Sequence, residues 1–221
     1  MNIAVIGANG KVGTRVVDEA RARGHQVTRV RSGRSRTAAG TDDADVRYAD
    51  VKDHDELAAA VAGHDAVVVA VHLDMDDPEV HADDPKTHEI MAQSILDGVS
   101  ESGVRRLVIV GGSGSLRVPP GVMYAFAPDF PSIYYPHASA QTHGWEVIRD
   151  ADTDLDWSYI CPAFRIHLDP GERTGKFRVG GDYLLIDENG LSRISYEDLA
   201  VAVLDELESP SHVREMFTVA Y

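Results

Sequence analysis

Residues 3–13 read Ile3-Ala-Val-Ile-Gly7-Ala-Asn-Gly10-Lys-Val-Gly13, an apolar run followed by three evenly spaced glycines. A short, continuous apolar run is typical of a strand that is covered on both faces. Apolar residues then recur at helical spacing from Lys11 to Arg23, and Gly24 ends that pattern. The opening of the chain therefore predicts a strand, a glycine turn and a helix.

Each glycine of this turn has a separate expected role. Gly7 permits the tight turn, Gly10 lets a diphosphate approach the backbone, and Gly13 lets helix and strand pack closely. The helix N-terminus adds free N–H groups and a partial positive charge. A purely structural glycine turn is the alternative, but a strand before the motif and a helix after it favour a dinucleotide. The predicted cofactor-binding residues of the turn are Gly7, Asn9, Gly10, Lys11, Val12 and Gly13.

Strand and helix patterns continue to alternate beyond this unit. Further strands are predicted at 26–30, 46–49, 66–71, 106–110 and 155–161, and helices at 53–62, 87–102 and 136–150. Such alternation predicts an α/β fold, a Rossmann-like doubly wound parallel sheet with a core over about residues 1–162. From 163 to 221 we expect a small extension on the substrate side of the same single domain. It comprises a hairpin of strands 176–179 and 183–186, a helix at 196–207 capped by Ser195, and a strand at 216–219.

The composition narrows the classes of partner. Lys and Arg number 21 and Asp and Glu 36, which gives a net charge of −15. So acidic a chain repels phosphate backbones and anionic lipids, so we expect a small-molecule substrate and neither nucleic acid nor membrane as partner. The single Cys161 cannot form an intrachain disulfide, and no signal sequence or membrane-length apolar run is visible, which predicts a cytoplasmic protein. Both a monomer and a homodimer are compatible with these features.

The end of the second strand favours NADP over NAD. Folds that bind NAD usually carry an acidic residue about 20 residues beyond the glycine turn. Here no Asp or Glu lies between Glu19 and Asp42, and the segment contains Arg29, Arg31, Arg34 and Arg36 instead. Guanidinium groups make paired, charge-assisted bonds to phosphate oxygens. We therefore predict that Arg31 and Arg34 bind a 2′-phosphate, with a solvated basic loop as the alternative.

With these elements placed, the sequence resembles the atypical short-chain dehydrogenase/reductases. Within them it is most similar to the NAD(P)H-binding group of NADH-flavin reductases, relatives of biliverdin reductase B and of NmrA-like proteins. The resemblance covers nearly the whole chain. Besides the opening stretch it rests on Asp50-Val51, Gly63-His-Asp-Ala-Val67, Gly111-Gly-Ser-Gly-Ser-Leu116, Pro170-Gly-Glu-Arg-Thr-Gly175 and Ser192-Arg-Ile-Ser-Tyr-Glu-Asp198.

The resemblance implies further cofactor contacts. Asp50 and Val51 are expected to flank the adenine, and Pro162 and Ala163 to lie near the nicotinamide. The remaining implied contacts are Ala70, Val71, His72, Gly111 and Gly112.

One departure from the superfamily concerns catalysis. Many members use Ser, Tyr and Lys, with Tyr and Lys four residues apart on a helix, where Lys lowers the Tyr pKa. Here Ser113 stands in the serine position, His137-Ala-Ser-Ala-Gln141 replaces the pair, and no lysine occurs between Lys86 and Lys176. Direct hydride transfer to a flavin or quinone tolerates that loss. We take Ser113, Tyr135 and His137 as catalytic candidates, with His137 as proton donor. A local turn hydroxyl and a surface histidine are the alternatives for Ser113 and His137.

The segment from 116 to 136 is predicted to be a flap over the nicotinamide. Its aromatic side chains would stack on a planar acceptor or only pack the flap down. The acidic stretch from 72 to 84 lacks the pattern of a calcium loop, so no metal is expected. Together these features predict hydride transfer from NADPH to FMN, FAD, a quinone or another planar acceptor. A non-catalytic NAD(P)H sensor of the NmrA type and a biosynthetic isomerase or dehydratase are the alternatives.

Overall fold

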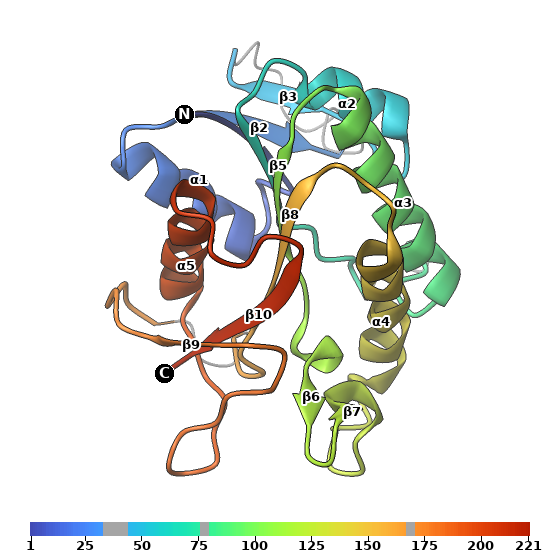
Figure 1. Cartoon of the computed structure of the whole chain (residues 1–221), viewed down its shortest axis with the longest axis vertical. Coiled ribbons are helices and arrows are strands. Elements are labelled where there is room, and N and C mark those ends of the chain that lie inside the picture. Colours follow the sequence, from blue (N-terminus) through green and yellow to red (C-terminus); the bar gives the residue numbers. More distant parts are fainter. Residues whose placement is uncertain (33–43, 76–79, 167–170) are drawn as a thin grey trace.

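The computed structural model describes residues 1–32, 44–75, 80–166 and 171–221, and it places one sheet between two layers of helices (Figure 1). The strands are β1 (Asn2–Ile6), β2 (Gln26–Arg31), β3 (Val46–Tyr48), β4 (Ala66–Val69), β5 (Arg106–Val110), β6 (Arg117–Val118), β7 (Val122–Met123), β8 (Asp156–Pro162), β9 (Arg178–Gly180) and β10 (Glu215–Ala220). The helices are α1 (Lys11–Ala22), α2 (His54–Val61), α3 (Pro85–Glu101), α4 (Tyr135–Asp150) and α5 (Tyr196–Glu208), with short 3₁₀ turns η2 (Ser113–Ser115) and η3 (Tyr124–Phe126).

The main sheet has eight strands in the order β3-β2-β1-β4-β5-β8-β10-β9. Its strands pair in parallel except β9, which runs antiparallel to β10 at one edge. The chain moves outward from β1 to β3 and then returns to place β4 on the other side of β1. In open sheets of this kind, ligands bind at the carboxyl ends of the strands where the winding reverses. The predicted Rossmann-like doubly wound fold is confirmed.

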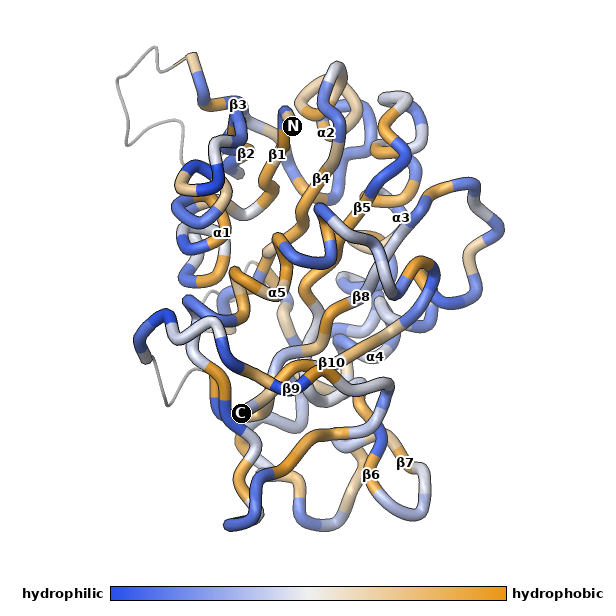
Figure 2. The backbone as a smooth tube through the Cα atoms, turned by 60° about the vertical axis from the view of Figure 1, so that its left-hand side comes forward, coloured by the Kyte–Doolittle hydropathy of each residue, from blue (hydrophilic) through white to orange (hydrophobic). Residues whose placement is uncertain are grey.

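Both faces of the sheet are buried, as the apolar strands predict. Along β1, Ile3 and Val5 belong to the core beneath α1 and α5, whereas Ala4 and Ile6 belong to the core beneath α2, α3 and α4. This alternation follows from the two-residue period of a strand. Figure 2 shows that hydrophobic residues are concentrated in the inner strands of the sheet. Among the described residues, no helix combines the length and apolar character needed to cross a bilayer.

The helices differ in whether a side chain caps their N-terminus, and this difference matters for the site. The side chains of Asp53, Asp84 and Ser195 cap α2, α3 and α5 by accepting hydrogen bonds from backbone N–H groups. The cap predicted at Ser195 is confirmed, with a 3.0 Å bond from Asp198 N to Ser195 Oγ. Helix α1 begins after Gly10, which has no side chain to offer. The first N–H groups of α1 are thus left for another acceptor.

The predicted hairpin of strands 176–179 and 183–186 is wrong. Only Arg178–Gly180 forms a strand, and its partner is β10. The following segment pairs with β6 instead, because Arg117 N donates to Asp182 O and Leu184 N donates to Arg117 O. The sequence signal of Gly180-Gly181-Asp182 marks a real change of direction, but the tertiary structure supplies the partners on both sides.

A buried carboxylate ties the loop before β9 to α1. Glu19 is 8% exposed and accepts bonds from Arg173 Nε at 2.7 Å and Arg23 Nε at 2.8 Å. Its hydrogen bonds, first from Arg173 and then from Arg23, lower the pKa of Glu19 from 4.5 to about 2 against the opposing effect of burial. Ionised Glu19 therefore links the C-terminal end of α1, at Arg23, to the 171–176 loop.

The ion pairs of Glu19 predict that the folded protein loses stability at acidic pH. Because the pKa of Glu19 is lower in the folded state, its contribution is complete above pH 4.5 and is lost as the pH falls toward 2. We expect Glu19→Gln to cost about 2 kcal/mol of unfolding free energy at pH 7, discounted for the exposure of Arg173, and much less near pH 2. Denaturant unfolding of both proteins across this range measures the difference. A gap between them that stays constant with pH would contradict the assignment.

Candidate active site

The glycine turn is shaped by the end of β4 and by its own backbone. Gly7 has a φ of 81°, and a Cβ there would lie 2.5 Å from Ala70 O. A Cβ at Gly13 would lie 2.1 Å from Gly7 O, so the close packing of helix on strand requires glycine. Among the described residues, chain neighbours aside, the nearest atoms to a Cβ at Gly10 would be Gly7 O at 3.4 Å and Ala70 O at 3.7 Å, which are ordinary contacts. The fold thus requires Gly7 and Gly13, whereas the absence of a side chain at Gly10 leaves room for a ligand.

The start of α1 borders this position, and its first N–H groups have no acceptor among the described residues. The first bond of the helix runs from Thr14 N to Gly10 O, so the amides of Lys11, Val12 and Gly13 precede any intrahelical acceptor. Thr14 Oγ1 donates to Ala8 O and helps to hold the turn. Backbone amides at a helix N-terminus bind diphosphate groups well. The residues present fit the diphosphate of a dinucleotide.

Arg31 is the last residue of β2, the strand next to β1. Its Nε is buried and has no hydrogen-bond partner in the part of the chain that the structure describes. A buried guanidinium nitrogen without an acceptor is costly, so a bound phosphate oxygen would stabilise it. Arg34, the other predicted contact, and Arg36 lie outside the described residues.

The other predicted cofactor residues all follow the carboxyl ends of parallel strands, so they share one edge of the sheet. They are Asp50 and Val51 after β3, Ala70, Val71 and His72 after β4, Gly111 and Gly112 after β5, and Pro162 and Ala163 at the end of β8. Their assignment to the adenine and the nicotinamide stays a prediction.

Two side chains explain why glycines follow β5. A Cβ at Gly111 would lie 2.1 Å from the ring of Tyr159, and a Cβ at Gly112 would lie 2.1 Å from Gln141 Oε1. Gln141 is half-buried, and its carboxamide has no hydrogen-bond partner among the described residues. Gln141 is not among the site residues predicted from the sequence. Its position four residues after His137, and so on the same face of α4, is the signal that could have found it.

Three histidines meet at the start of α4. The His137 ring lies 5.0 Å from that of His72 and 5.4 Å from that of His88. His137 Nδ1 and His88 Nε2 both bond to Ala82 O, at 3.1 and 2.9 Å. Burial lowers the pKa of both His88 and His137. The sequence offered no signal for His88 beyond its place on the inner face of a helix.

The shared carbonyl fixes the tautomers of these two rings. A carbonyl oxygen only accepts, so the protons reside on His137 Nδ1 and His88 Nε2. His137 Nε2 then carries a lone pair while the ring is neutral. His137 is therefore equipped to accept a hydrogen bond or a proton near neutral pH, rather than to store a proton for donation.

The other two catalytic candidates differ in their relation to His137. Ser113 lies in η2, which packs on the first turns of α4, since a Cβ at Gly114 would be 3.1 Å from Ala138 Cβ. Tyr135 begins α4, is 45% exposed, and its ring lies 6.3 Å from Phe126. Residues two apart on a helix do not face each other, so Tyr135 and His137 point in different directions.

The aromatic side chains of the predicted flap, residues 116–136, fall into two groups. Tyr124 is buried, and its ring contacts Phe130 at 5.0 Å and Phe164 at 5.4 Å, so these aromatics hold the segment down. Phe126 and Tyr135 stay half-exposed, with their rings 6.3 Å apart. The β6–β7 hairpin and the 181–190 segment lie together at the lower end of the molecule in Figure 1, beyond the carboxyl end of β5.

Comparison with known proteins agrees with this geometry. The model of a family described as NAD(P)H-binding matches residues 7–210. A structure of a candidate exported protein from Burkholderia pseudomallei is 36% identical, with a TM-score of 0.84 and full coverage of both chains. A candidate epimerase from Bacteroides thetaiotaomicron is 34% identical, with a TM-score of 0.84, over 100% of this chain and 96% of that one.

A candidate NADH-flavin reductase from Streptococcus pneumoniae is 31% identical, with a TM-score of 0.78, over 100% of this chain and 99% of that one. The glycine turn, the strand order and these matches lead to one assignment. The chain belongs to the NAD(P)H-binding family and has the Rossmann-like fold of the atypical short-chain dehydrogenase/reductases.

Proposed function

We propose that the protein is an NADPH-dependent reductase that transfers hydride to a flavin, a quinone or another planar acceptor. The observation that carries the proposal is the uncapped start of α1 beside Gly10, which has no side chain to cover it. The 31% identical candidate flavin reductase and the half-exposed aromatics Phe126 and Tyr135 support a planar acceptor. The cytoplasm remains the predicted compartment, although one relative is described as exported.

The chain's own residues bind and orient, while NADPH supplies the hydride. The α1 amides hold the diphosphate, and Arg31 holds the 2′-phosphate. Reduction of the acceptor consumes one hydride and one proton. Since burial lowers the pKa of His137, the proton comes from solvent and His137 Nε2 accepts a hydrogen bond from the acceptor or from that water. No Tyr–Lys pair is then needed.

The bare His137 Nε2 also favours a second function. A neutral imidazole with its proton fixed on Nδ1 is a suitable base for removing a proton from a substrate carbon or hydroxyl. A candidate epimerase is 34% identical to the chain. This reading makes the protein an epimerase or dehydratase that uses the same cofactor site.

The decisive experiment mixes the protein with NADPH and FMN, riboflavin or menadione and follows the nicotinamide absorbance. Oxidation of NADPH with any of these acceptors supports the reductase. NADPH binding without turnover contradicts it and is the result expected for a sensor. Deuterium uptake from solvent into a substrate carbon that depends on His137, tested with His137→Gln, would favour the second function.

Arg31 tests the choice of cofactor. Replacing it with methionine keeps the aliphatic stem and removes the charge. We expect Arg31→Met to weaken NADPH binding by about 30-fold and NADH binding by less than about 3-fold, because charge-assisted bonds to the 2′-phosphate are lost. Calorimetry measures both constants. The matched control is Arg21→Met, an exposed arginine on α1. Equal losses for the two nucleotides would remove the argument for NADP.

A further inference from the structure

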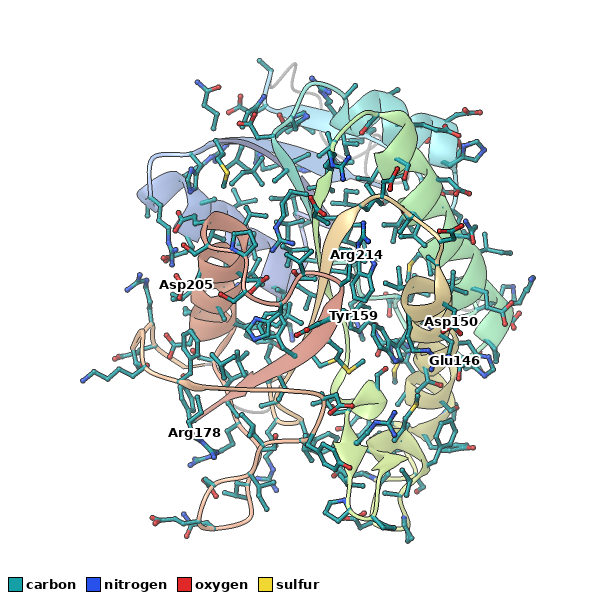
Figure 3. All side chains as sticks on the ribbon, in the orientation of Figure 1. Glu146, Asp150, Tyr159, Arg178, Asp205 and Arg214 are labelled. Carbon is teal, nitrogen blue, oxygen red and sulfur yellow. The ribbon has the colours of Figure 1, made fainter. Side chains whose placement is uncertain are left out.

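A small cavity lies between the sheet and helices α3 and α4, next to the carboxyl ends of β4 and β5. Its volume is about 30 Å³, and its walls are mostly aliphatic. Three polar side chains also line it: His88 from α3, Gln141 from α4 and Tyr159 from β8. Figure 3 shows Tyr159 directed from the sheet toward α4, where its ring lies 4.8 Å from Trp145. The cavity is therefore apolar in general character but has a few polar groups at defined places.

His88 has unfilled hydrogen-bonding capacity in this cavity. It is 1% exposed, and its single N–H is used at Nε2, which donates to Ala82 O at 2.9 Å. Its Nδ1 is a buried lone pair without a hydrogen-bond partner in the described part of the chain. A buried acceptor of this kind destabilises the folded state unless a donor reaches it.

Gln141, on the α4 side of the cavity, also has unfilled hydrogen-bonding capacity. Its carboxamide rests on the backbone of Gly112, where no side chain separates the two. No hydrogen bond from a described residue holds it there. His88 and Gln141 are also not bonded to each other, so only a third group can satisfy both.

We propose that this cavity binds one water-sized hydrogen-bond donor, which donates to His88 Nδ1 and bonds the Gln141 carboxamide. A site for one water needs at least about 10–15 Å³ and two to four polar partners, and this cavity meets both conditions. The aliphatic walls exclude an ion, because a charge there would lack counter-charges. The donor is an internal water or a hydroxyl or amide N–H of the bound nucleotide.

The bound donor connects α3 and α4 to the turn after β5. It fixes the position of Gln141 at the edge of the sheet where the cofactor is predicted to bind. It also holds the His88 ring, whose Nε2 shares Ala82 O with His137. The site itself does not depend on the proposed reductase activity.

A double-mutant cycle tests the shared donor. His88→Phe, Gln141→Met and the double variant are compared by thermal unfolding, with and without NADPH. With an internal water, each single change lowers the Tm of the ligand-free protein by about 3 °C, and the double change lowers it no further than one single change does. The same non-additivity seen only with NADPH present assigns the donor to the nucleotide. Additive effects of the two substitutions on the Tm, both with and without NADPH, would overturn the proposal. A rise in the Tm of either single variant would also overturn it, unless the substitutions are non-additive when NADPH is present.

Two controls keep the result interpretable. Gln93→Met makes the same substitution on the exposed face of α3 and is expected to leave the Tm unchanged. If His88→Phe does not fold, a crystal structure of the unchanged protein that resolves ordered water decides the matter. In crystals grown with and without NADPH, density within hydrogen-bond distance of both His88 Nδ1 and Gln141 supports the site, and a cavity that is empty in both contradicts it.

Discussion

Replacing Gly10 with valine is expected to weaken NADPH binding by about 100-fold without unfolding the protein. Among the described residues, chain neighbours aside, the nearest atom to a Cβ at this position would be Gly7 O at 3.4 Å, an ordinary contact, so the turn tolerates the added Cβ. The branched side chain would instead occupy the approach to the uncapped N-terminus of α1. Calorimetric titration of NADPH, together with circular dichroism to check the fold, measures the effect.

Two other glycines separate a loss of binding from a loss of folding. Gly181 has nothing within 4 Å of an added Cβ, so Gly181→Val is expected to leave both binding and stability unchanged. Gly13→Ala forces a Cβ to 2.1 Å from Gly7 O and is expected to destabilise the β1–α1 unit. A well-folded Gly10→Val protein with undiminished affinity for NADPH would refute the diphosphate assignment.

The second large effect is expected at Asp198, where asparagine should cost about 3 kcal/mol of unfolding free energy. This carboxylate is fully buried and accepts bonds from Thr174 N at 2.8 Å, Gly175 N at 2.7 Å and Tyr221 Oη at 2.9 Å, as well as from the Thr174 hydroxyl. An amide would turn N–H groups toward some of these donors. Those donors would then be left buried without acceptors, which is why a nearly isosteric change is expected to be costly.

Denaturant unfolding measures this loss, and Asp205→Asn is the matched control. Asp205 lies on the same helix and faces outward (Figure 3), and its partner Arg23 retains Glu19 and Glu208. We expect that change to cost less than about 1 kcal/mol. Similar costs for the two substitutions would show that the buried bonds of Asp198 contribute little.

Asp198 also shows how little of a residue's structural role a sequence motif can reveal. The stretches Pro170–Gly175 and Ser192–Asp198 mark the family resemblance, yet neither contains a spacing that reveals its role. In the structure they bind each other, because Asp198 accepts from Thr174 and Gly175, and Ser195 Oγ donates to Glu172 O. Pro170 lies outside the described residues. Together the two motifs attach the 171–176 loop to the start of α5. This role can be recognised only when the two segments are seen in contact.

The parts of the fold whose interactions are local could be predicted from the amino-acid sequence. The β1–turn–α1 unit, the alternation of strands and helices and the cap at Ser195 depend on residues within a few positions of one another, so their pattern is visible along the chain. Three contacts became apparent only in the folded chain: the partner of Arg178–Gly180, the shared acceptor of His88 and His137, and the placement of Gln141 on Gly112. These contacts join segments far apart in the chain, and no local periodicity specifies which buried surfaces will meet.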